Sequence, residues 1–130
     1  MPYDSLIAGY LAHADAVAHD HEDEHFWAYE GLHGLVEKKP DIAWPVVIEV
    51  ISRVTDDDTL DYVAADILED LICANPSGLI ERIEELARAD GQFRSALKGV
   101  SGWTRMPRDV RDRLDAIVGR RPSHEMGDAG

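Results

Sequence analysis

Three prolines, Pro40, Pro76 and Pro107, each begin a segment with the same spacing of apolar residues. Proline suits the first turn of a helix, because the N–H that it lacks has no partner there. Apolar residues three, seven and ten places later lie on one face of a helix, which is the face that packs. In these segments they are Ala43, Val47 and Val50; Leu79, Ile83 and Leu86; and Val110, Leu114 and Ile117. The pattern predicts three helices, each with one buried side.

The rest of the chain also has helical spacing, over residues 6–17, 26–36, 60–72 and 93–97, with no convincing alternating strand. Asp4 or Ser5 is expected to cap the first of these helices, and Asp56 to Asp58 suit the positive end of the third. The sequence therefore predicts an all-α fold of about six to seven helices.

The prolines are 36 and 31 residues apart, close to the length of a helix pair. This spacing favours antiparallel pairs stacked as in HEAT or armadillo proteins, and an irregular helical bundle fits almost as well. A chain of 130 residues has room for one ordinary domain. We expect a single helical domain over residues 1–118 and a flexible tail over residues 119–130.

The charge of −13 is unevenly distributed along the chain. Residues 1–74 carry 17 acidic and 3 basic side chains, whereas residues 75–130 carry 9 and 10. Such a surface repels phosphates, which argues against direct binding of nucleic acid or of an anionic membrane. It favours a protein partner with a basic cleft.

The compartment is predicted from three further observations. The first residues, MPYDSLIAGY, lack the basic start of a secretory signal, and no apolar run approaches the roughly 20 residues of a membrane-spanning helix. The single cysteine, Cys73, excludes an internal disulfide. We expect a cytoplasmic protein.

The segment from His19 to His25, HDHEDEH, contains the pattern H-E-x-x-H, in which two histidines one turn apart hold zinc in metalloproteases. Its two intervening residues are acidic and no third ligand stands at a persuasive spacing, which argues against a protease. A solvated acidic linker that caps the next helix with Asp23 or Glu24 explains the same residues. Metal binding by His19, His21 and His25 with the adjoining carboxylates remains an alternative.

No nucleophile elbow, P-loop or dinucleotide fingerprint is present. The carboxylate pairs Asp61/Asp66 and Asp66/Asp70 are typical of the wet face of an amphipathic helix, and Cys73 of a small core residue. We therefore predict no enzyme activity, no catalytic residue and no cofactor.

Three tryptophans are candidate anchors in the core or in an interface. Trp27 follows the acidic run directly and would suit an interface beside charge. Trp103, in a glycine-flanked loop, is expected to be exposed, and Trp44 belongs to the apolar segment after Pro40.

Residues 26–118 resemble a family of small bacterial helical proteins of unknown function. The words that carry the resemblance are WAYEGL, LEDL and the ERIEELAR…FRSAL pattern, and the HDHEDEH segment lies outside it. Proteins of this size and pattern are similar to immunity proteins that neutralise bacterial toxins. The resemblance implies an inhibitor-like role and supplies no active-site residues.

The leading hypothesis is a non-enzymatic binding protein, specifically an immunity protein that occludes the basic cleft of a cognate toxin. A HEAT-like regulatory or scaffold adaptor and a metal-binding protein that uses the His19–His25 segment are the alternatives. The residues predicted to bind the partner are Asp20, Glu22, Asp23, Glu24, Trp27, Asp56, Asp57, Asp58, Asp61, Glu69 and Asp70.

Overall fold

The computed structural model describes residues 3–100 and 105–119, and within them the chain is helical with no strand. The all-α prediction is confirmed. Trp103 and the predicted tail beyond residue 119 lie outside the described residues. The elements in order are α1 (Asp4–Ala18), α2 (Phe26–Lys38), α3 (Pro40–Arg53), α4 (Asp57–Val63), η1 (Ala64–Leu68), α5 (Glu69–Ala74), α6 (Pro76–Ala89), α7 (Gly91–Leu97) and α8 (Arg108–Val118).

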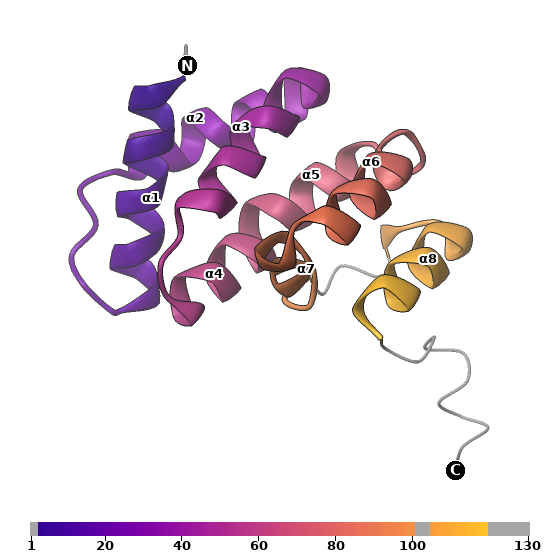
Figure 1. The fold of residues 1–130 in the computed structure, drawn as a ribbon. Coiled ribbons are helices and arrows are strands. Elements are labelled where there is room, and N and C mark those ends of the chain that lie inside the picture. Colours follow the sequence, from indigo (N-terminus) through magenta and orange to yellow (C-terminus); the bar gives the residue numbers. More distant parts are fainter. Residues whose placement is uncertain (1–2, 101–104, 120–130) are drawn as a thin grey trace.

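The helices follow one another along the molecule, with α1 and α2 at one end and α8 at the other (Figure 1). At the first end α1 packs against α2, α3 and α4, and at the other α8 packs against α6 and α7. The acidic first half of the sequence and the nearly neutral second half therefore occupy different ends of the fold.

One continuous helix, formed by α4, η1 and α5, connects these ends. Its middle, from Ala64 to Leu68, has the wider turn of a π-helix. Single π turns inside α-helices often mark functional sites, because the extra residue displaces the side chains around it. Here the displaced segment includes Asp66, which contacts both α1 and α2. The helical periodicity did not predict this turn.

The proline-led segments behave as predicted. Pro40 and Pro76 begin α3 and α6, while Pro107 is the N-cap of α8. Of the nine apolar positions after the three prolines, seven are buried, and Leu86 and Ile117 are partly buried against the core. α3 contacts α1, α2, α5 and α7, which fits its nearly all-round apolar surface.

The ends of two helices differ from the prediction. The N-cap of α1 is Tyr3, with no side-chain cap, so Asp4 lies in the first turn and does not cap the helix. α2 begins after His25, and neither Asp23 nor Glu24 caps it with a side chain. Asp56 does cap α4, by accepting a hydrogen bond from the N–H of Thr59 at 3.0 Å. In the described part of the chain, no helix combines the length and the apolar character needed to cross a membrane.

Candidate functional site

Two stretches rich in carboxylates, residues 15–27 and 56–62, are linked through His13 and His19, and we call them the acidic end. These stretches contain nine aspartates and glutamates and no lysine or arginine. They form the last turn of α1, the linker to α2, the first residues of α2 and the beginning of α4. Two histidines of α1 hold them together.

His13 fixes the linker to the helices beneath it. Its side chain is 4% exposed. The Nδ1 atom lies 2.6 Å from Asp23 Oδ2, and Nε2 lies 2.8 Å from the hydroxyl of Tyr62 on α4. Burial, with the nearby charge of Asp66, raises the pKa of Tyr62, so the hydroxyl keeps its proton. The imidazole of His13 thus joins the carboxylate of the linker to the hydroxyl on α4.

Asp23 is an anion that is held by the fold. Its Oδ1 accepts the backbone N–H of His25 at 2.8 Å. That hydrogen bond lowers the pKa of Asp23, and the contact with His13 lowers it further. The carboxylate at the middle of the predicted acidic linker therefore sets the path of the chain into α2.

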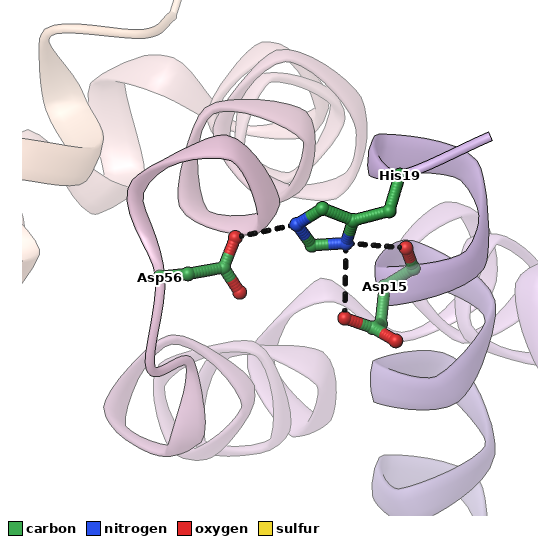
Figure 2. A group of neighbouring side chains, drawn as sticks. All are labelled: Asp15, His19 and Asp56. Carbon is green, nitrogen blue, oxygen red and sulfur yellow. Dashed lines mark hydrogen bonds and ion pairs between the residues drawn. The ribbon is translucent and has the colours of Figure 1, made fainter. Parts of the chain in front are cut away.

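His19 makes the second connection. Its Nδ1 lies 2.9 Å from the backbone oxygen of Asp15 and 3.1 Å from that residue's carboxylate. Its Nε2 lies 3.1 Å from Asp56 Oδ2 at the start of α4 (Figure 2). This side chain spans the gap between the two stretches of the acidic end.

A second polar network lies beside the acidic end, around the π turn. Tyr10 is fully buried, and its hydroxyl donates to Asp66 Oδ2 at 2.5 Å. His33 of α2 places Nε2 2.9 Å from Asp66 and Nδ1 2.9 Å from Asp70. The ring of Tyr29 lies 4.4 Å from the ring of His33. The three helical segments α1, α2 and η1 thus meet at one carboxylate.

The protonation of this network follows from its surroundings. Burial raises the pKa of Tyr10, and Asp66 raises it further, so the phenol stays neutral. Burial alone would lower the pKa of His33, but the hydrogen bonds and charges of Asp66 and Asp70 outweigh it and raise the pKa. An imidazolium that donates from both nitrogens satisfies two carboxylates at once. These groups are hydrogen-bonded to one another, and their hydrogen bonds join α1, α2 and η1.

Cys73 lines a shallow groove with His33, Asp70 and Arg105. Burial raises the pKa of the thiol, which keeps it protonated. It packs partly buried against the core, in agreement with its predicted role as a small core residue.

Most of the predicted partner-binding residues belong to the two stretches of the acidic end. Those with exposed side chains there are Asp20, Glu22, Glu24, Trp27, Asp57, Asp58 and Asp61. Asp23 and Asp56 belong to the same region but are partly buried and hydrogen-bonded within it. Glu69 and Asp70 lie elsewhere, on α5, where Arg105 pairs with both of them.

Two exposed aromatic side chains follow the acidic linker directly in the sequence. Phe26 and Trp27 are each 53% exposed, at the first turn of α2. Gly9 of α1 makes room for Trp27, since a Cβ at Gly9 would lie 2.7 Å from the indole ring. Trp27 is therefore seated on α1 with about half of its surface open. Trp44 is partly buried, with its ring edge-on to Phe93 at 6.0 Å.

The network around Asp66 is the part of the site that the sequence reasoning missed. Asp66 was expected on the wet face of its helix, but its side chain is only 16% exposed. A signal was present: Tyr10 and His13 are three residues apart, Tyr29 and His33 four apart, and so are Tyr62 and Asp66. Each pair lies on one helix face, so polar aromatic pairs on neighbouring helices can meet a carboxylate between them.

Residues 15–121 match the model of a family of unknown function, DUF6869. The chain belongs to this family. The DUF6869 match includes the HDHEDEH segment, so the expectation that the segment lies outside the family was wrong. The comparisons with curated proteins and with solved structures gave no match. The predicted family of helical proteins of unknown function is thus confirmed, while its likeness to immunity proteins and its bacterial origin stay predictions.

Proposed function

We propose that this DUF6869 protein is a non-enzymatic binding protein that uses the acidic end to hold a basic protein partner. The observation that carries the proposal is the half-exposed pair Phe26 and Trp27, which directly follows a linker of exposed carboxylates. Aromatic anchors next to charge are typical of interfaces, where the ring supplies buried area and the charge supplies orientation.

Electrostatics supports the same partner chemistry. Among the described residues, the ion pairs of the acidic end join its carboxylates to His13 and His19, and no arginine or lysine lies in either stretch. Asp57, Asp58 and Asp61 are exposed at the start of α4. Their field would attract a basic surface and increase the rate of association.

Packing supports a rigid surface. Asp23 and His13 hold the linker on α1, His19 joins α1 to α4, and Gly9 seats Trp27. A surface that is already ordered loses less entropy on binding than a mobile one. In its most specific form the proposal is an immunity protein, in which this surface occludes the basic cleft of a toxin.

The test uses the protein as bait for its partner, with matched variants. One bait carries Asp57→Asn, Asp58→Asn and Asp61→Asn, a second carries Trp27→Ala, and the control carries Glu81→Gln and Glu85→Gln on the exposed surface of α6. We expect the wild type and the control to capture the same basic protein, and the first two variants to lose it. Equal capture by all four baits would remove the acidic end as the binding surface.

The captured protein then tests the mechanism and the immunity form. Its association rate should fall about tenfold or more between low and high salt, because steering by charge is screened. The Asp57/Asp58/Asp61 variant should associate slowly even at low salt, whereas Trp27→Ala should mainly dissociate faster. For an immunity protein, the captured partner must be toxic when expressed alone and be inhibited by the wild type. A partner without toxicity would support the adaptor alternative.

A further inference from the structure

The three side chains in Figure 2 come from two helices and converge at one gap. Asp15 and His19 lie one turn apart at the end of α1, and Asp56 lies at the start of α4. One donor atom from each residue lies within 4.8 Å of the other two. The proposed binding surface uses the exposed carboxylates around these three side chains, but it assigns no ligand to the space between them.

The hydrogen bonds of His19 determine which of its nitrogens is available. The backbone oxygen of Asp15 can only accept, so Nδ1 carries a proton and donates it at 2.9 Å. Nε2 lies 3.1 Å from the Asp56 carboxylate, so a proton on Nε2 makes this contact an ion pair. When that proton leaves, Nε2 bears a lone pair, and the same two atoms can hold a metal ion between them.

The geometry suits a metal ion in that position. Two bonds of about 2.0–2.2 Å to nitrogen and oxygen place ligands roughly 2.8–3.1 Å apart at a right angle and roughly 3.3–3.6 Å apart at the tetrahedral angle. The observed separation of His19 Nε2 and Asp56 Oδ2 is 3.1 Å. Histidines that bind metals commonly donate their other N–H to a backbone carbonyl, as His19 does to Asp15.

The donor set indicates the class of ion. Imidazole nitrogen is a ligand for zinc and other first-row transition metals, whereas magnesium and calcium prefer oxygen alone. The Asp15 carboxylate is 59% exposed, and to become a third ligand it would turn from its 3.1 Å contact with His19 Nδ1 toward the ion. Water would complete the coordination on the exposed side.

We propose that His19 Nε2 and the Asp56 carboxylate, with Asp15 as a third ligand, bind a divalent transition-metal ion of the zinc class. The ion joins the end of α1 to the beginning of α4. It has a structural role, because it would fix two of the segments that form the acidic end. This site uses His19 and two aspartates, and does not need the H-E-x-x-H pattern between His21 and His25.

Zinc titration of the untagged full chain tests the proposal. We expect one Zn²⁺ per chain by calorimetry, a higher melting temperature with zinc, and visible d–d absorption when Co²⁺ replaces zinc. His19→Ala should weaken binding by more than about tenfold, since it removes a ligand. Asp56→Asn should do the same while the helix keeps its cap, because asparagine caps as well as aspartate.

The matched control is His25→Ala, which removes a histidine of the same acidic segment outside the gap. It should leave the affinity, the stoichiometry and the cobalt spectrum unchanged. The proposal fails if the wild type binds no zinc, in which case a proton occupies the gap and His19 is an imidazolium. It also fails if His19→Ala binds as tightly as the wild type, or if only His25→Ala loses binding.

Discussion

Around the contact of α1, α2 and α4, the carboxylates held within the fold are paired with histidines, whereas between α6 and α8 the pairing cation is arginine. His13, His19 and His33 contact Asp23, Asp56 and Asp66 at the first end. At the other end Arg113 makes two hydrogen bonds to Glu84, one of 2.9 Å from its Nε. Both arrangements cross between helices, so they serve the same structural purpose with different chemistry.

The difference has two consequences. A histidine pair loses its charge near neutral pH, while an arginine keeps its charge throughout. In addition, the His13–Asp23 and His33–Asp66 pairs are largely buried and adjoin tyrosine hydroxyls, whereas the Arg113 side chain is 41% exposed. We expect the acidic end to depend more on its polar contacts and on pH than the α6–α8 contact does.

Asp66→Ala should have the largest effect. It leaves the hydroxyl of buried Tyr10 without an acceptor and removes one carboxylate from His33. Loss of a buried, charged acceptor should lower the free energy of unfolding by about 2–4 kcal/mol. Urea denaturation measures it, with Asp61→Ala as the control, because Asp61 is exposed on the preceding α4. A loss as small as that of Asp61→Ala would show that the network does not support the fold.

The backbone around this network could be predicted from the sequence, but the network itself could not. Apolar spacing after Pro40 and Pro76 identified α3 and α6, because helix formation and core packing are encoded locally. The pairing of Tyr10 with Asp66 joins residues 56 apart in sequence. It depends on how α1 crosses the π turn, and a periodic pattern within one helix has no information on that crossing.

The acidic end likewise combines features that the sequence predicts with features that only the packing of the helices determines. The density of aspartates at residues 56–58 and the position of Trp27 beside the acidic run were visible in the sequence. The packing of α1 against α4, which brings residues 56–58 next to the acidic linker region, is not visible there. The assignment of Glu69 and Asp70 to that surface treated charge as exposed wherever it occurs, and it did not anticipate that Arg105 would pair with them.

Gly9→Ala tests how tightly the acidic end is packed. The new Cβ would lie 2.7 Å from the Trp27 ring and 2.8 Å from Ala28 Cβ, so α1 or the indole must move. We expect a loss of about 1–3 kcal/mol in unfolding free energy and a changed tryptophan emission. Gly34→Ala in α2 is the matched control, because no neighbour lies within 4 Å of its Cβ, and it should be neutral or stabilising. Equal effects of the two changes would argue against a rigid seat for Trp27.

His33 should contribute to the pH dependence of stability. Its pKa in the folded protein is raised above the ordinary value of 6.5 by Asp66 and Asp70, although Arg105 also contacts Asp70. A raised pKa stabilises the fold fully below pH 6.5, and this stabilisation is lost as the pH rises through the folded value. Unfolding free energy should therefore decline between about pH 6 and 8.

The variant His33→Gln separates this contribution from the others, because glutamine does not titrate. Denaturation curves across the same pH range should be flatter for His33→Gln than for the wild type. Glu84→Gln at the other end should keep the wild-type slope over that range. An unchanged slope in His33→Gln would mean that the two ends do not differ in their response to neutral pH.

Glu84→Gln should have the smallest effect on stability. The hydrogen bonds from Arg113 lower the pKa of Glu84 below its ordinary value of 4.5, so the pair contributes above that pH. The contribution is lost as the pH falls through the lowered pKa. Water and salt screen this pair, so we expect Glu84→Gln to lower the free energy of unfolding by less than about a third of the loss for Asp66→Ala. High salt should make the effect smaller still. Thermal melts at pH 7 in low and high salt measure it. A large loss of stability that does not depend on salt would mean that the Arg113–Glu84 pair stabilises the fold as much as Asp66 does. The two ends would then differ in their response to pH and not in how much their polar contacts contribute to stability.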